Sequence, residues 1–135
     1  MALNDSPVGL LSWIVEKLRS WSDCHGDLET RFSKDDLRTV VMIYWVTQSH
    51  GTSARYYYEA AHDPWKPLHA RMPVVEAPTG ISVLPAEFAG APRRWVQRYY
   101  NLKQKRHHAS GGHYGAWEEP EAIVMDVRDF FRTLT

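Results

Sequence analysis

Apolar residues recur with the spacing of an α-helix through much of the first half of the chain. A helix-start signal at residues 5–7, Asp-Ser-Pro, precedes an apolar stripe formed by Val8, Leu11, Val15 and Leu18. Ser33 and Asp36 have the spacing of a capping box before an apolar run at 37–45, which predicts a second helix. Adjacent β-branched residues in that run leave a buried strand as the alternative. A short third helix is predicted over 53–61, which contains consecutive tyrosines.

The second half of the chain alternates between short strands and helices. Prolines 64 and 67 lie too close together for regular structure between the two halves. The pattern then predicts a strand at 78–84, a helix at 92–100, an edge strand at 102–108 and an amphipathic helix at 120–134. This alternation is typical of the α/β class, in which helices cover a parallel sheet. The charged residues of the second strand weigh against its burial, and two parallel strands form no stable layer alone, so we expect part of a larger fold.

Length and composition are those of an ordinary globular chain. With 135 residues, 44% hydrophobic residues and a formal net charge of +0, we expect one core and no overall attraction to nucleic acid or anionic membranes. The single cysteine, Cys24, excludes an internal disulfide. The longest apolar stretch near the N-terminus, residues 8–15, is too short to cross a bilayer and lacks a secretory cleavage pattern. We therefore expect a cytoplasmic protein with no membrane segment.

The residues also raise two other classes of function, nucleic-acid binding and metal binding. Basic and aromatic residues alternate over 93–106, a composition that also binds single-stranded nucleic acid, but zero net charge favours a solvated helix face. A metal site could draw on His107, His108 and His113, but adjacent histidines on a strand point to opposite faces. We predict neither a nucleic-acid partner nor a metal site.

The segment at 110–121 carries the most informative chemistry. Glycines 111 and 112 allow a close backbone approach, and they place His113 on a loop between the second strand and the last helix. Glu87 follows the first strand and would lie at the equivalent edge of the sheet. A carboxylate after one strand and a histidine after the next can hold an imidazole in the tautomer that accepts a proton. On the residues alone, the alternative that both are ordinary surface loop residues stays open.

Five sequence blocks, spread over almost the whole chain, form a more specific pattern than any single motif: Asp5–Leu10, Phe32–Leu37, Tyr44–Trp45, Pro78–Gly80 and Gly111–Glu121. In content and order they resemble the C-terminal part of the microsomal-type epoxide hydrolases, a branch of the α/β-hydrolase superfamily. The resemblance implies a helical cap portion at residues 1–72. It also implies that residues 73–135 form the last two strands and helices of the α/β-hydrolase core.

The resemblance further implies hydrolysis of an epoxide to a vicinal diol by water, with no cofactor. In this family a carboxylate opens the epoxide to an alkyl ester, and a histidine-activated water then hydrolyses that ester. His113 matches the general base and Glu87 the acid that orients it. Residues 55–59 resemble the family block that carries one of two cap tyrosines, which protonate the ring oxygen, and the other cap tyrosine is absent from this sequence. Tyr57 matches the first of these, while helix packing is the alternative role for its neighbours Tyr56 and Tyr58. The 13% content of aromatic residues indicates an apolar epoxide as the substrate.

The chain departs from the family at the nucleophile. The family's nucleophilic aspartate lies on a tight strand-to-helix elbow, a context that none of the aspartates at 23, 27, 35, 36 and 63 has. Without a nucleophile, this chain alone is predicted to be inactive. The alternative function is a catalytically silent hydrolase half, either a remnant or a complementing subunit. Its expected partner is the missing N-terminal half, or a second copy that associates through a free sheet edge.

Overall fold

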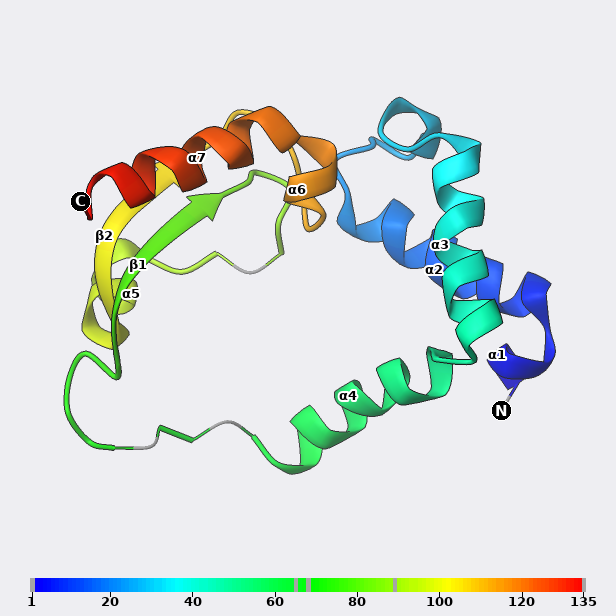
Figure 1. Ribbon diagram of the computed structural model, residues 1–135, viewed down its shortest axis with the longest axis horizontal. Helices are drawn as coiled ribbons and strands as arrows, with labels where there is room; N and C mark the ends of the chain where they lie inside the picture. Colours follow the sequence, from blue (N-terminus) through cyan, green and yellow to red (C-terminus); the bar gives the residue numbers. More distant parts are fainter. Residues whose placement is uncertain (1, 65, 68, 89, 135) are drawn as a thin grey trace. The chain divides into compact units, whose positions relative to one another are not determined.

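The structure is a computed structural model that describes residues 2–64, 66–67, 69–88 and 90–134. Its elements in chain order (Figure 1) are α1 (Ala2–Asp5), α2 (Pro7–Trp21), the 3₁₀ helix η1 (Leu28–Thr30), α3 (Lys34–Thr47), α4 (His50–His62), β1 (Val75–Val83), α5 (Arg93–Tyr99), β2 (Tyr100–His107), α6 (Gly115–Glu118) and α7 (Pro120–Arg132).

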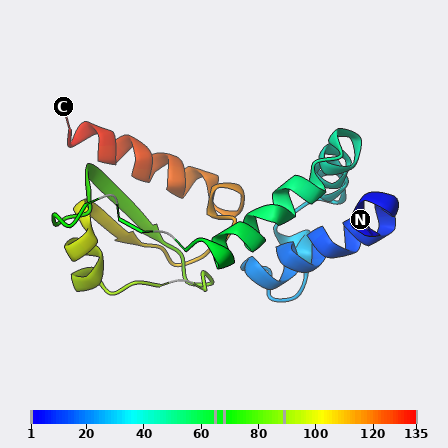
Figure 2. The same cartoon turned by 90° about the horizontal axis from the view of Figure 1, so that it is seen from below.

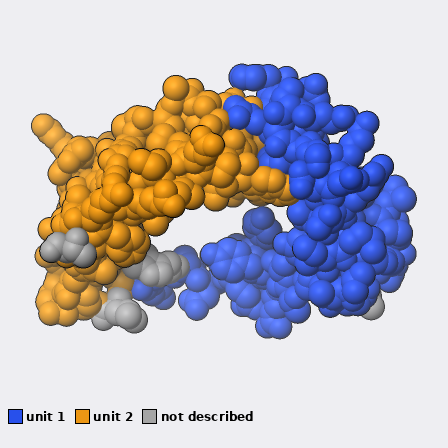
Figure 3. Space-filling model, turned by 45° about the horizontal axis from the view of Figure 1, so that its top comes forward, with its two compact units in different colours: residues 1–20, 24–66 blue, residues 21–23, 67–135 orange. Residues whose placement is uncertain are grey.

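The chain divides into two compact units (Figure 3). Unit 1 contains Met1–Ser20 and Cys24–Lys66, and unit 2 contains Trp21–Asp23 and Pro67–Thr135. The chain length predicted a single core, and the structure differs in this respect. Prolines 64 and 67 explain the difference, because they interrupt regular structure between the last helix of unit 1 and the first strand of unit 2.

Local capping contacts set the helix starts in unit 1. At the start of α2, Gly9 N donates a hydrogen bond of 3.1 Å to Ser6 Oγ. At the start of α3, Asp36 N donates to Ser33 Oγ and Ser33 N donates to Asp36 Oδ2, both at 3.1 Å. This reciprocal box satisfies backbone donors that only a helix leaves free, so the β-branched run forms α3 rather than a strand. The predicted first and second helices are confirmed.

The apolar core of unit 1 is small. Its buried apolar side chains among the described residues are Leu10, Leu18, Cys24, Phe32 and Val41. His50, the first residue of α4, is also buried, and the rings of Trp13 and Tyr44 meet it edge-on at 6.1 and 6.4 Å between centroids. Most of α4 is exposed, including its three tyrosines, as is a patch of α3 formed by Met42, Ile43 and Val46. Unit 1 therefore leaves much of its apolar surface uncovered.

Unit 2 is built on a two-stranded parallel sheet. β1 and β2 pair from Val75 opposite Tyr100 to Val83 opposite His107, with irregularities early in β1. Figure 2 shows α7 along one face of the strands and α5 on the other. Gly80 allows α7 to pack closely, because a Cβ at that position would lie 2.9 Å from the Phe130 ring. The predicted order of strand, helix, strand and helix is confirmed, as is the parallel pairing.

Polar side chains from β1, from β2 and from the residue after β2 bond to Asp126, which lies buried on α7. Asp126 is 4% exposed. Its Oδ2 accepts hydrogen bonds from Ser82 Oγ at 2.5 Å and from His108 Nε2 at 2.7 Å, and Arg106 donates to Oδ1 at 3.1 Å. Gln104 Nε2 donates to the Asp126 carbonyl at 3.0 Å. As the charged residues of β2 suggested, none of its residues is fully buried. The strand is largely half-buried, and Gln104 and Arg106 find hydrogen-bond partners on α7.

These contacts set the charge state of Asp126. Burial raises the pKa of a carboxyl group, because it disfavours the ionised form. Hydrogen bonds from Ser82, His108 and Arg106 together outweigh burial and hold the pKa of Asp126 below its ordinary value. The ionised carboxylate therefore joins β1, β2 and α7.

The shortest elements and the element ends depart from the sequence pattern. The helices α1, η1 and α6 were not predicted, because three or four residues carry no hydrophobic period. The third helix begins at His50 rather than residue 53, and the first strand begins at Val75 rather than residue 78. In the part of the chain that the structure describes, no helix combines the length and the hydrophobicity needed to cross a membrane.

Candidate active site

The candidate site lies at the carboxyl edge of the sheet in unit 2. The parallel strands end opposite each other at Val83 and His107, so the loops that follow them leave from the same edge. Backbone hydrogen bonds join these loops: His108 N donates to the Val83 carbonyl at 2.9 Å, and Ala86 N donates to the Gly111 carbonyl at 3.1 Å. The loop after β1, which carries Glu87, therefore runs beside the loop that carries His113.

Glu87 and His113 are in hydrogen-bond contact. Nδ1 of His113 lies 3.0 Å from Oε2 of Glu87, and the two side chains are 38% and 24% exposed, respectively. An ionised carboxylate only accepts hydrogen bonds, so in the neutral imidazole Nδ1 carries the proton and Nε2 keeps its lone pair. The structure thus brings together two residues that the sequence singled out, in the tautomer that suits a general base.

Aromatic rings surround the imidazole of His113. Phe88 stacks on it with 4.9 Å between ring centroids. Trp21 and Tyr114 approach it edge-on at 5.2 and 5.4 Å. These rings restrict the orientation of the imidazole and replace water on several of its sides, so the pair with Glu87 is held by packing as well as by the hydrogen bond.

The sequence did not reveal the residues that hold the His113 loop. His113 N donates to the Trp21 carbonyl at 2.8 Å, and Gly111 N donates to Asp23 Oδ2 at 2.9 Å. The sequence marks Asp23 only as an aspartate without the context of a nucleophilic elbow. The buried Glu118 accepts hydrogen bonds from two backbone amides of the same region. The block at 110–121 contains Glu118, but no sequence signal connects it to a segment 95 residues away.

Tyr57 lies in unit 1, on α4. Its side chain is 59% exposed, and its ring meets that of Tyr56 edge-on at 6.4 Å between centroids. The structure brings Glu87 and His113 together within unit 2, whereas Tyr57 is described within unit 1 alone. Its role as a proton donor stays a prediction.

No aspartate of the described residues lies between a strand and the following helix. Asp23 follows α2, and Asp27 caps η1 by accepting a hydrogen bond from Glu29 N. Asp35 and Asp36 lie in the first turn of α3, and Asp63 directly follows α4. The others, Asp5, Asp126 and Asp129, lie within helices. Among the described residues, no aspartate therefore lies on a strand-to-helix elbow of the kind that carries the family's nucleophile.

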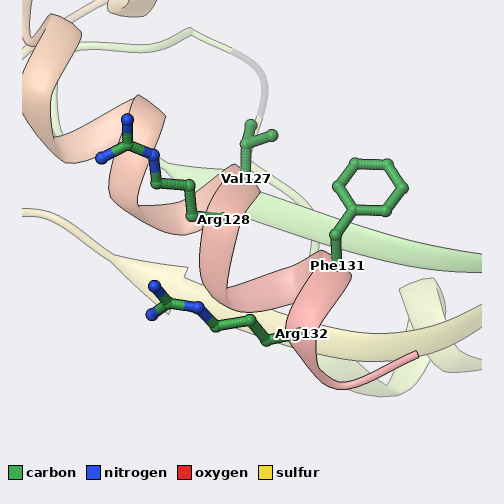
Figure 4. Close-up of a pocket in the computed structure, with 4 residues that line it drawn as sticks. All are labelled: Val127, Arg128, Phe131 and Arg132. Atoms are coloured by element: carbon green, nitrogen blue, oxygen red, sulfur yellow. The ribbon is translucent and has the colours of Figure 1, made fainter. Parts of the chain in front are cut away.

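Two hollows of unit 2 differ in their relation to this site. A cavity of about 190 Å³ between the strands and α5 has Glu87 among its lining residues. A second hollow lies on α7, where Val127, Arg128, Phe131 and Arg132 project from successive turns (Figure 4), and it contains no nucleophile or base. Among the residues with a described placement, no group of three or more His, Cys, Asp or Glu is arranged to hold a metal ion.

An acid and a histidine on successive loops at the carboxyl edge of a parallel sheet define a part of an α/β-hydrolase fold. The structure matches juvenile hormone epoxide hydrolase from the silkworm Bombyx mori with a TM-score of 0.83 at 30% identity, over 100% of this chain and 34% of that one. It matches an enantioselective mutant of the Aspergillus niger epoxide hydrolase with a TM-score of 0.78 at 32% identity, over 97% of this chain and 32% of that one.

The sequence agrees with the structural comparison. The chain is 39% identical over 140 residues to "Epoxide hydrolase 1" of the pig, Sus scrofa, which covers 98% of this chain and 31% of the pig protein. No model of a known protein family matches it. The chain is therefore homologous to the microsomal and juvenile hormone epoxide hydrolases, as the sequence blocks indicated, and it spans about 30% of the length of these curated relatives.

Proposed function

We propose that this chain supplies the general base and its orienting acid to an epoxide hydrolase. The observation that carries the proposal is the 3.0 Å contact between His113 Nδ1 and Glu87 Oε2 at the carboxyl edge of the sheet. Homology to epoxide hydrolases supports the reaction class. The substrates would be a small apolar epoxide and water, and the product a vicinal diol, with no cofactor.

The reaction needs two stages, and the pair acts in the second. First, a carboxylate outside these residues attacks an epoxide carbon, the carbon–oxygen bond of the ring breaks, and an alkyl ester forms. Then His113 Nε2 takes a proton from water as the water oxygen attacks the ester carbonyl. The ester bond breaks, the imidazolium returns its proton to the departing alkoxide, and the diol leaves. The proton of the released carboxyl group restores the phenol that protonated the ring oxygen, so the carboxylate is regenerated. Glu87 stabilises the imidazolium that forms on His113.

Tyr57 is proposed as the donor that protonates the ring oxygen in the first stage. An alkoxide is a poor leaving group in an apolar site, and a phenol can supply the proton that it needs. The support is the match of residues 55–59 to the family block, together with a position on a helix that exposes the phenol. Tyr56 and Tyr58 are exposed on the same helix, so they serve as matched controls.

A second candidate function is a catalytically silent hydrolase half. No aspartate of the described residues occupies a strand-to-helix elbow, so the chain alone is proposed to form no alkyl ester. The partner would be a polypeptide that supplies the missing part, or a second copy of this chain. The mass of the native polypeptide, isolated with an antibody against α7, separates the candidates: a mass well above 15.6 kDa favours the complete enzyme, and 15.6 kDa favours the silent half.

The decisive experiment is a fusion in which this chain replaces the matching 31% of the pig protein. We expect the fusion to convert an aryl epoxide that the pig protein hydrolyses into its diol, and the chain alone to form none. A fusion with His113→Gln controls for background hydrolysis. A folded fusion that forms no diol would contradict the proposal. The proposed cytoplasmic location is tested separately, by fractionation of the source cells.

A further inference from the structure

Glu118 lies buried between two stretches of unit 2 that are far apart in the sequence. Only 8% of the residue is exposed. Its Oε2 accepts a hydrogen bond from Asp23 N at 2.7 Å, and its Oε1 accepts one from Tyr114 N at 3.0 Å. Both carboxylate oxygens are thus bonded to backbone amides, one beside His113 and one in the segment that follows α2.

The same two stretches meet directly at further points. His113 N donates to the Trp21 carbonyl at 2.8 Å, and Gly111 N donates to Asp23 Oδ2 at 2.9 Å. Gly112 lies so close that an added Cβ would be 2.7 Å from the Trp21 carbonyl oxygen. The backbone of the loop therefore packs directly against the backbone at Trp21, and only glycine permits so close an approach.

The hydrogen bonds that Glu118 accepts from Asp23 N and Tyr114 N affect the position of His113 relative to Glu87. Amide hydrogen bonds to an ionised carboxylate are stronger than those between neutral groups. The bonds to Glu118, Asp23 and Trp21 hold the backbone on both sides of His113, and the backbone position sets how far Nδ1 lies from Glu87. Without the Glu118 carboxylate, two amides in a half-buried region lose their acceptor, and the loop gains freedom to move.

We propose that Glu118 is a positioning residue that holds the His113 loop against Trp21–Asp23, so that Nδ1 of His113 stays bonded to Glu87. Its catalytic consequence rests on the proposed function, since His113 is a general base only in that reaction. The contacts themselves are independent of any reaction. The proposal therefore admits a test in the chain without substrate.

The test measures the tautomer of His113 in the 135-residue chain joined to the remaining part of the pig relative, without substrate. The added part covers the surface through which the chain alone is expected to self-associate. Nitrogen-15 NMR of labelled histidines reports which ring nitrogen carries the proton, and His113→Gln identifies the His113 signals by their loss. Glu118→Gln leaves one acceptor oxygen in place of two. We expect the fraction protonated at Nδ1 to fall by about half or more, towards its value in Glu87→Gln. Glu121→Gln, at an exposed position on α7, should leave the tautomer unchanged.

A second variant keeps the test decisive if Glu118→Gln does not fold. Gly112→Ala retains the carboxylate but forces the loop away from Trp21, and it should give the same change of tautomer. Gly90→Ala is its matched control in unit 2, because an added Cβ there meets nothing within 4 Å. A folded Glu118→Gln or Gly112→Ala chain in which His113 keeps the wild-type tautomer would overturn the proposal.

Activity separates this proposal from the proposed function. In the fusion with the pig protein, Glu118→Gln should slow hydrolysis of the alkyl ester and leave the rate of ester formation unchanged. An equal loss in both stages would overturn the positioning role. If the folded fusion with the wild-type sequence forms no diol, the proposed function is wrong, while the tautomer measurement still decides whether Glu118 positions His113.

Discussion

At the scale of single residues, the contact between Glu87 and His113 is the feature with the clearest chemical consequence. The hydrogen bond of 3.0 Å places a proton on Nδ1 and leaves Nε2 as the basic atom. The stacked Phe88 and the edge of Trp21 limit other orientations of the ring. The pair therefore suits the removal of a proton from water, and each proposed role predicts a different kinetic defect.

Replacement of His113 by glutamine in the fusion should stall the reaction at the alkyl ester. Ring opening does not need the imidazole, whereas ester hydrolysis loses its general base and should slow by about 1,000-fold. Intact mass spectrometry after mixing with an aryl epoxide should detect a polypeptide heavier by one substrate. Unchanged turnover, with no trapped ester, would remove His113 from the mechanism.

Replacement of Tyr57 by phenylalanine should slow the opposite stage. Loss of one proton donor should reduce the rate of ester formation by about 10-fold, because the family resemblance implies a second tyrosine outside this chain. Single-turnover measurements on the fusion separate ester formation from ester hydrolysis. Tyr56→Phe and Tyr58→Phe should have little effect, and a defect found in one of these variants instead would reassign the donor.

At the scale of elements, a buried carboxylate joins the strands to the last helix. Asp126 on α7 bonds to Ser82 on β1, to Arg106 on β2 and to His108 just after β2. Arg106 also bonds to Asp129, one turn further along α7, at 2.8 Å. The polar residues that made β2 look unsuited to burial are thus the ones that attach it to α7.

The substitution Asp126→Asn should destabilise unit 2 by about 3 kcal/mol, because it leaves Arg106 and His108 without the charge that they face. The pKa of Asp126 is lowered in the folded chain. The ionised Asp126 carboxylate therefore contributes its full stabilisation of the fold at pH values above its unfolded-state pKa of about 4. This stabilisation is lost as the pH falls through the lower pKa of the folded state.

Urea unfolding measured between neutral and acidic pH tests this prediction. Wild type should lose stability relative to Asp126→Asn as the pH falls below about 4, so the two curves converge. Asp35→Asn is the control, because the Asp35 side chain is 88% exposed in unit 1. A constant difference between wild type and Asp126→Asn at every pH would contradict the assignment to this carboxyl group.

At the scale of the whole molecule, much apolar and hydrogen-bonding surface is left uncovered. Each strand of the two-stranded sheet pairs along one edge only among the described residues. Large apolar side chains are exposed on both units, including Met42, Ile43, Val46, Val127 and Phe131. A sheet edge and apolar helix faces of this kind are normally covered by other parts of a fold. The chain spans about 30% of its relatives, which agrees with that expectation.

The chain made alone should therefore self-associate. Analytical ultracentrifugation over a range of protein concentrations should show species larger than 15.6 kDa that increase with concentration. Addition of the remaining part of the pig relative should reduce self-association by covering the free sheet edge. A stable monomer with cooperative unfolding would show that the uncovered surface does not need a partner.

The features that the sequence alone determined are those encoded by neighbouring residues. The capping box of Ser33 and Asp36 and the apolar period of α2 identified helices, because their contacts span a few positions. The order of strands and helices in unit 2 followed from local periods in the same way. Glu87 and His113 could be singled out because both follow strands, and parallel strands end at one edge.

Tertiary structure decided the features whose distant partners no local pattern identifies. It decided the division into two units, the half-buried state of β2 and the bridge from Glu118 to Asp23, a partner 95 positions away. A polar strand and a buried acid look unfavourable until their partners are known, because the cost of burying a polar group depends on the hydrogen bonds that it receives. Those bonds come from distant segments, and only the folded chain brings them together.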